Sequence, residues 1–122
     1  MFKTYYTDKK IKWITLPDSS KVKLYPSSQV SYPQNFTATH RDIRLIGKAY
    51  FKVTEDSNRP FSVWSDHTKT TALGTSFTID AYKKQRNTTV TLHSGKIVIK
   101  SANRESKFDE IYLSNKGKKL IL

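Results

Sequence analysis

Histidine side chains are the first candidates for chemistry in this 122-residue chain. The three histidines, His40, His67 and His93, lie far apart, and none stands at metal-ligand spacing from another His, Asp or Glu. The sequence contains no cysteine, which excludes disulfides and thiolate metal ligands. We therefore expect no metal and no cofactor, and we expect each histidine at the surface or in a turn.

Acid–base or nucleophilic catalysis would need other groups in defined arrangements. Residues 73–77 (LGTSF) are typical of an extended segment rather than of the GxSxG turn of a nucleophilic serine. The four glycines are spread over the chain and form no phosphate-binding loop. No catalytic residue is predicted, but a carbohydrate-active enzyme remains an alternative if two acids converge in a cleft. The candidate acids are Asp18, Asp42, Asp66 and Asp80.

The net charge of +12 raises the possibility of an anionic partner. A basic all-β module for single-stranded nucleic acid or an acidic glycan is the alternative from another functional class. Phe51, Phe61 and Phe77 fall on the face expected to be buried, so they are not available for stacking. Lysines such as Lys21 and Lys23 alternate with apolar residues, which favours a basic solvated surface instead. The possible exposed aromatic residues are Tyr5, Tyr6, Trp13, Tyr50, Trp64 and Tyr82.

The elements that position these residues are best defined in residues 42–53 (DIRLIGKAYFKV), where every second residue is apolar or small. Because successive side chains of a strand point to opposite faces, this pattern predicts a long strand, or a bent pair, with one buried face. Gly47 and Ala49 leave little side chain at the centre of that face, so we expect another segment to press against Gly47. Ile46 is the one apolar residue that the pattern places on the polar face.

The remaining segments are short, extended and separated by turn residues. Residues 11–16 and 21–25 are expected to form a hairpin around Pro17 and Asp18. Residues 25–40 contain two prolines and should be irregular or an edge, pinned by Val30, Tyr32 and Phe36. Further expected strands are residues 61–64, with Phe61 and Val63 inward, the series Leu73, Thr75, Phe77, Ile79 and Ala81, and residues 111–113.

A second hairpin is predicted at residues 90–99, with Ser94 and Gly95 as the turn. Leu92 would then face Ile97 and Val90 would face Ile99, which places all four apolar side chains on one face. The chain has no internal repeat and no dividing linker. The predicted fold class is therefore all-β, as a two-layer sandwich or solenoid-like arrangement of short, mainly antiparallel strands in a single domain over residues 1–122.

Six motifs follow one another between residues 11 and 119. Residues 16–24 (LPDSSKVKL) are similar to LPDGSxVxL, and residues 31–36 (SYPQNF) are similar to YPxxF. Residues 41–53 are similar to RxVxLxGEAYFxV. The others are RPFSV at 59–63, LGTSF at 73–77 and a VTLxEGxVxV-like segment at 90–99. In this order they resemble the periplasmic FecR domain of anti-sigma regulators, especially the Bacteroidetes type, although Ser19, Lys48 and Ser94 replace a Gly and two Glu residues.

The resemblance implies a non-enzymatic signalling role without catalytic, cofactor or metal residues. Such a domain receives a signal from a TonB-dependent outer-membrane transducer and controls an extracytoplasmic-function sigma factor through a cytoplasmic segment. It lies in the periplasm as part of a single-pass inner-membrane protein, so the membrane helix and the flanking domains are expected outside this sequence. Pro17, Asp18, Ser20, Gly47 and Gly74 would have structural roles, and nucleic acid would not be a partner.

Overall fold

The computed structural model describes residues 2–85, 87–101 and 110–122 as an all-β domain. No described segment is a helix long and apolar enough to cross a membrane. The strands are short except for β5, in agreement with the turn residues that divide the sequence. They are β1 (Phe2–Tyr6), β2 (Lys12–Thr15), β3 (Lys21–Leu24), β4 (Gln29–Pro33), β5 (Arg41–Lys52), β6 (Phe61–Ser65), β7 (Thr68–Ala72), β8 (Ser76–Ala81), β9 (Thr89–Ser94), β10 (Ile97–Ser101), β11 (Ile111–Leu113) and β12 (Lys119–Ile121).

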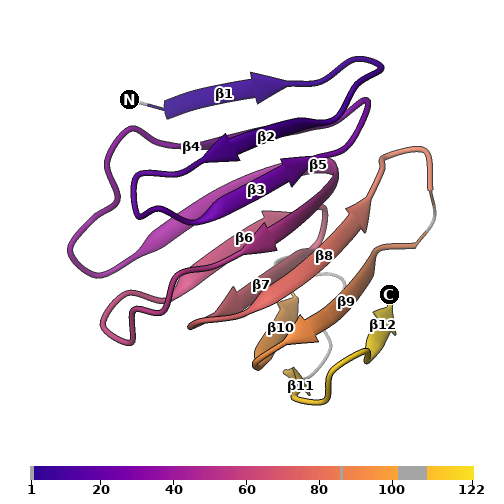
Figure 1. Ribbon diagram of the computed structural model, residues 1–122. Helices are drawn as coiled ribbons and strands as arrows, with labels where there is room; N and C mark the ends of the chain where they lie inside the picture. Colours follow the sequence, from indigo (N-terminus) through magenta and orange to yellow (C-terminus); the bar gives the residue numbers. More distant parts are fainter. Residues whose placement is uncertain (1, 86, 102–109) are drawn as a thin grey trace.

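Strand β5 organises the sheet, because its two halves have different neighbours (Figure 1). Its first half pairs with β4 and with β6, and its second half pairs with β3 and β8. The main strand order is β11-β10-β7-β6-β5-β8-β9-β12, with β1–β4 and β2–β3 attached beside β5. The pairing of β5 with β6 is parallel and the other described pairings are antiparallel. The all-β class is confirmed, and the expected sandwich or solenoid is instead one mixed sheet nearly closed into a barrel-like shape.

Gly47 marks the place where β5 passes from one half of the sheet to the other. Its φ of 96° lies in the region that side chains disfavour. A Cβ atom at this position would overlap Ser28, whose hydroxyl oxygen accepts a hydrogen bond of 2.9 Å from the Lys48 amide. The prediction that another segment presses on Gly47 is therefore confirmed, and that segment is the turn before β4.

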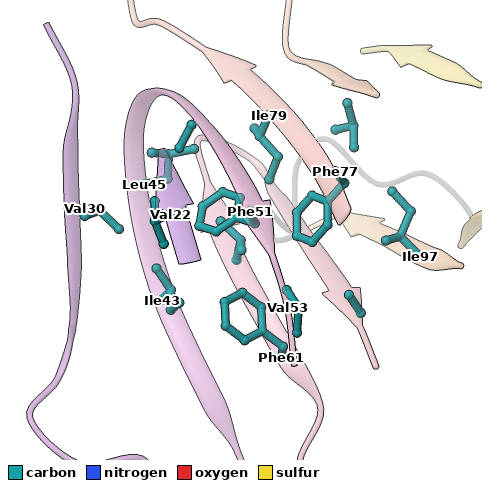
Figure 2. Close-up of a cluster of buried hydrophobic side chains, with 14 of the residues drawn as sticks. Val22, Val30, Ile43, Leu45, Phe51, Val53, Phe61, Phe77, Ile79 and Ile97 are labelled. Carbon is teal, nitrogen blue, oxygen red and sulfur yellow. The ribbon is translucent and has the colours of Figure 1, made fainter. Parts of the chain in front are cut away.

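The core lies inside the folded sheet and is built from alternate residues of its strands. Ile43, Leu45, Ala49, Phe51 and Val53 are all buried, as the alternation of residues 42–53 predicts. Figure 2 shows the central aromatic cluster. The ring of Phe51 stacks on that of Phe77 with centroids 5.2 Å apart and meets that of Phe61 edge-on at 6.0 Å.

The hairpin predicted around Pro17 and Asp18 is confirmed. Strands β2 and β3 are antiparallel, with Ile14 opposite Val22. The turn is closed by the Asp18 carboxylate, which accepts a hydrogen bond of 2.9 Å from the Ser20 amide. Ser19 has a φ of 73°, a conformation for which Gly is the usual residue. The departure from Gly at this position therefore changes the residue and not the turn.

The hairpin predicted at residues 90–99 is wrong in its pairing. Strand β9 pairs with β8 and β12, whereas β10 pairs with β7 and β11. Val90, Leu92, Ile97 and Ile99 are nevertheless all buried in the same core. The turn at Gly95, with a φ of 82°, carries the chain from one half of the sheet to the other. Strands from different halves of the sheet can bury their side chains in the same core. The alternation of apolar residues therefore could not identify which strands pair.

Three further expectations need correction. Residues 25–40 were expected to be irregular or an edge, but they contain β4, which pairs with β1 on one side and β5 on the other. The prolines permit this, because Pro26 precedes the strand and Pro33 is its last residue. Strands β1 and β7 were not predicted, since their residues are largely polar or exposed. Leu73 is 48% exposed, because β8 begins only at Ser76. The inward positions of Phe61, Val63, Val30 and Tyr32 are confirmed.

Candidate functional site

The most buried charge of the described chain belongs to Arg41, the first residue of β5, which is 0% exposed. Its guanidinium donates hydrogen bonds to the Asp18 carboxylate at 2.8 Å and to the carbonyl oxygens of Thr54 at 2.9 Å and Arg59 at 2.7 Å. The Ser20 hydroxyl donates to the same carboxylate at 2.8 Å and accepts from the Thr54 amide at 3.0 Å. Asp18, Ser20, Arg41 and Thr54 are here called the buried clasp. It joins the β2–β3 turn to both ends of β5.

The clasp holds Asp18 as a carboxylate. Burial would raise the pKa of Asp18, but the hydrogen bonds from Arg41 and Ser20 and the charge of Arg41 outweigh this effect and lower the pKa below its ordinary value. All acceptors of the site are already occupied by protein donors. The arrangement is therefore a structural lock and not an acid poised for proton transfer.

Sequence reasoning missed the role of Arg41, although a signal was present. Arg41 has the same parity as Ile43, Leu45 and Phe51, so a strand that buries those side chains also buries Arg41. A charge in phase with an apolar face needs a partner inside the protein. The turn residue Asp18, which lies close by only in the fold, is that partner.

The first outer face of the sheet is hollowed beside β1, β4, β5 and β6. A groove of about 780 Å³ is lined there by residues including Phe2, Gln29, Asp42, Arg44, Ile46 and Trp64, and we call it the outer groove. Ile46 lies opposite Gln29 on β4, and Arg44 lies between Ser31 on β4 and Trp64 on β6. Ile46, whose apolar side chain the alternation left unexplained, is 38% exposed and forms part of the apolar lining.

The second outer face lies on β2, β3 and the second half of β5. We call it the basic aromatic face, and it is formed by lysines and aromatic residues: Trp13, Lys21, Lys23, Tyr25, Lys48, Tyr50 and Lys52. The Lys23 ammonium lies 5.8 Å from the ring centre of Trp13 and 5.2 Å from that of Tyr25. The Lys48 ammonium lies 4.6 Å from the Tyr25 ring. Lysines and aromatic rings thus alternate across this part of the sheet.

The three histidines considered above lie apart in the structure, whereas two of the four candidate aspartates line one groove. His40 bonds with Thr39, His67 lies 3.5 Å from Asp66, and His93 bonds with Thr78 on the neighbouring strand. Among the described residues, no group of three His, Cys, Asp or Glu side chains could hold a metal ion. Asp80 accepts a hydrogen bond from Gln85, and Asp42 and Asp66 both line the outer groove.

Of the six aromatic residues named above as possibly exposed, some cover other side chains and some lie open on the surface. Tyr5 stacks on the buried Tyr32, and the Tyr82 hydroxyl donates to the Pro26 carbonyl, so both are partly buried. Trp13 is 59% exposed on the basic aromatic face beside Tyr50, whereas Tyr6 and Trp64 are exposed on other parts of the surface. They do not form one continuous stacking platform.

The fold and the clasp define an all-β domain with a nearly closed sheet. The particular family follows from the sequence, which matches the model of the FecR protein family over residues 3–98. The chain belongs to the FecR protein family. This family is non-enzymatic, so the two carboxylates of the outer groove do not define a glycosidase site. No functionally curated protein matches the sequence significantly.

Solved structures agree with the family. Crystal structures of a "putative anti-sigma factor from Parabacteroides distasonis ATCC 8503" superpose on the chain. One has 26% sequence identity and a TM-score of 0.86, covering 100% of this chain and 60% of that one. The other has 26% identity and a TM-score of 0.85, covering 98% of this chain and 59% of that one. The chain therefore spans about three-fifths of that protein's length.

Proposed function

We propose that this chain is the periplasmic signal-receiving domain of an anti-sigma regulator. In this role it relays a signal from a TonB-dependent outer-membrane transducer to an extracytoplasmic-function sigma factor. The observation that carries the proposal is the match to the FecR family over residues 3–98, supported by the likeness to the Parabacteroides structures over the whole chain. FecR domains are typically periplasmic parts of inner-membrane regulators.

The Parabacteroides protein is longer than this chain, which supports a place within a larger regulator. We propose that residues 1–122 are one domain of a single-pass inner-membrane protein, whose cytoplasmic segment contacts the sigma factor. The transducer's signalling domain would contact the domain described here, and the membrane would be contacted only through the helix of the regulator.

The outer groove is the surface that best suits a protein partner in this role. It combines the exposed apolar side chains of Phe2, Ile46 and Trp64 with the charges of Asp42 and Arg44. An apolar centre with a polar surround is the usual composition of a protein contact. Strand β1 borders the groove and, among the described strands, pairs with β4 alone, so its other edge is available for strand addition.

Binding of the chain to purified signalling domains of the host's TonB-dependent transducers tests the proposal. We expect saturable binding to one of them. Trp64→Ala should weaken this binding by roughly tenfold, because a Trp side chain that becomes buried in a protein contact often contributes much of the affinity. Tyr112→Ala, a change of an exposed aromatic residue on β11 outside the groove, is the matched control and should alter the affinity less than about twofold.

Localisation is tested separately. An alkaline phosphatase fusion placed after the domain in the natural full-length protein should be active, because that enzyme needs the oxidising periplasm. An inactive fusion would rule out the periplasmic assignment. Binding to none of the transducer domains would contradict the signalling partner while leaving the family assignment intact.

A further inference from the structure

The basic aromatic face brings four lysines together on one side of the sheet, and the acidic residue that faces one of them is Asp80 on β8, opposite Lys48. Lys21 on β3 lies directly opposite Lys52 on β5, and Lys23 lies opposite Tyr50. Like charges directly opposite each other destabilise a sheet. None of the ion pairs formed among the described residues involves Lys21, Lys23, Lys48 or Lys52. The Lys21–Lys52 pair is therefore a repulsive arrangement that an anionic partner would relieve.

Neighbouring side chains hold three of these ammonium groups in place. Lys23 lies over the rings of Trp13 and Tyr25, Lys48 lies over the ring of Tyr25, and Lys21 donates a hydrogen bond of 2.9 Å to the Thr15 hydroxyl. A lysine that is already positioned loses less conformational entropy when it binds an anion. Three of the four ammonium groups of the face are thus positioned by neighbouring side chains.

The aromatic rings of this face do not offer a platform for bases or sugars. Trp13 and Tyr50 meet at 78° with centroids 6.3 Å apart, so their planes are not parallel. Trp13 and Tyr25 already carry lysine ammonium groups on their rings. Stacking of nucleic acid uses open aromatic faces, whereas carboxylates need only accessible ammonium groups. The basic aromatic face is therefore better suited to binding carboxylate groups through its lysines than to stacking bases or sugars on its rings.

The spacing of the lysines matches an extended chain. Lys21 and Lys23 stand two residues apart on β3, which corresponds to about 6.8 Å along a strand. Figure 1 shows β3 beside the second half of β5. Lys52 lies opposite Lys21, and Lys48 lies at the other end of this pairing, next to Ala49, the partner of Leu24. An extended segment with an acidic residue at every second position repeats its carboxylates at the same interval of about 6.8 Å.

We propose that the basic aromatic face binds an acidic protein segment in an extended conformation, with carboxylates at alternate positions on Lys21, Lys23, Lys48 and Lys52. The segment runs along β3 and the second half of β5, on the side of the sheet away from the core. Its binding does not require the outer groove or the anti-sigma role.

The experiment uses the 122-residue chain and two synthetic peptides, six repeats of Glu-Ser and six repeats of Gln-Ser. Nuclear magnetic resonance titration should show binding of the Glu-Ser peptide, with amide shifts concentrated in β3 and the second half of β5. Its affinity should exceed that of the Gln-Ser peptide by at least about tenfold at low salt and should fall as salt is added.

Charge reversal provides the specificity test. Lys23→Glu combined with Lys52→Glu should weaken binding of the Glu-Ser peptide by about tenfold or more. Lys69→Glu is the matched control, because Lys69 also lies over a tryptophan ring, 4.8 Å from Trp64, on the other outer face. It should change the affinity less than about twofold. Retained dispersion of the amide signals shows that each variant is folded. The double variant Lys23→Gln, Lys52→Gln should weaken binding of the Glu-Ser peptide by a smaller factor than the double charge reversal does.

Three results would overturn the proposal. The first is equal binding of the Glu-Ser and Gln-Ser peptides, and the second is an equal loss from Lys69→Glu, which would show general attraction to a basic protein. The third is tighter binding of oligothymidine or of phosphatidylglycerol vesicles than of the Glu-Ser peptide. Any of these results would leave transducer binding at the outer groove unaffected, so the two proposals can be separated.

Discussion

Strand β5 carries positive charge at both of its ends, and the two ends place that charge in opposite surroundings. At the start of the strand, Arg41 is fully buried against the Asp18 carboxylate and the carbonyl oxygens of Thr54 and Arg59. At the far end, Lys48 and Lys52 face outward, beside an aromatic ring and opposite another lysine. The bend at Gly47 separates the two environments.

The difference shows how one strand divides structural from available charge. A buried charge contributes to the fold only as long as every partner remains, and the loss of one partner leaves the other uncompensated. An exposed lysine contributes little to stability because water and salt screen it. The clasp can therefore fix the domain, while the basic aromatic face can bind or release a partner without unfolding it.

Removal of the Arg41 charge should have the largest effect. Arg41→Met leaves the buried Asp18 carboxylate without its opposite charge and removes the Arg41 hydrogen bonds to two backbone carbonyls, so we expect the free energy of unfolding to fall by about 3–5 kcal/mol. Urea unfolding followed by tryptophan fluorescence measures the change. The double variant Arg41→Met, Asp18→Leu should recover part of the loss, because it leaves no charge unpaired. A loss below about 1 kcal/mol for Arg41→Met would contradict the clasp.

The bend that separates the two ends of β5 should be the next most sensitive position. Gly47→Ala introduces a Cβ at a φ of 96° and drives it into Ser28, so we expect a loss of about 2–3 kcal/mol. Gly117→Ala is the matched control, since Gly117 has a φ of 84° but nothing lies near its Cβ position. It should lose only about 1 kcal/mol. Equal losses would show that Ser28 contributes nothing to the bend.

The clasp should also make the domain sensitive to acid. The pKa of Asp18 is lowered in the folded chain, because the donors of Arg41 and Ser20 outweigh its burial. The unfolded chain therefore binds a proton on Asp18 more readily than the folded one. The stabilisation is fully present above the unfolded pKa and is lost as pH falls through the folded pKa.

Unfolding midpoints of the native chain and of Asp18→Asn, compared between about pH 7 and about pH 2, test this expectation. The native chain should be the more stable of the two near neutral pH, and the difference should shrink on acidification. A difference that does not change with pH would mean that Asp18 acts through its shape and hydrogen bonds alone. Asp56, whose pKa is lowered by the hydrogen bond from Arg59 in a partly exposed pair, is present in both chains, so its effect cancels.

The sequence predicted most of the buried positions of β5 but not which strands pair with each half of it. Alternation identified Ile43, Leu45, Ala49 and Phe51 as core residues, and the small centre predicted a close contact at Gly47. The same alternation could not reveal that β4 and β6 flank one half and β3 and β8 the other. Local periodicity fixes which face is buried, whereas partner choice depends on contacts between distant segments.

The surfaces were predictable only in part. The excess of lysine and the exposure of Trp13 were visible in the sequence, but the cross-strand neighbours that place Lys23 over Trp13 depend on register. Ile46 was visible as an exception, yet Trp64, which lines the same groove, comes from the parallel strand β6 eighteen residues further on. The failed pairing at residues 90–99 has the same origin, since a turn sequence does not tell whether the chain returns beside itself or crosses the core.

The smallest expected change is at the exposed end of β5 and has the opposite sign. Lys52→Glu replaces a like-charge pair with Lys21 by an opposite-charge pair on adjacent strands, so it should stabilise the domain by about 0.2–1 kcal/mol. Urea unfolding at low ionic strength measures the gain, which added salt should reduce. Lys52→Gln should give part of it, because it removes the repulsion without adding an attraction.

The same variant should weaken binding of the Glu-Ser peptide, since it removes one of the four lysines and adds a repelling carboxylate. A variant that is more stable but binds less well would show that the charge of Lys52 opposes folding and is available to a partner. Destabilisation by Lys52→Glu would instead mean that the lysine contributes to the fold as Arg41 does. In that case the two ends of β5 would use their charges in the same way, and the basic aromatic face would lose its energetic argument for a partner.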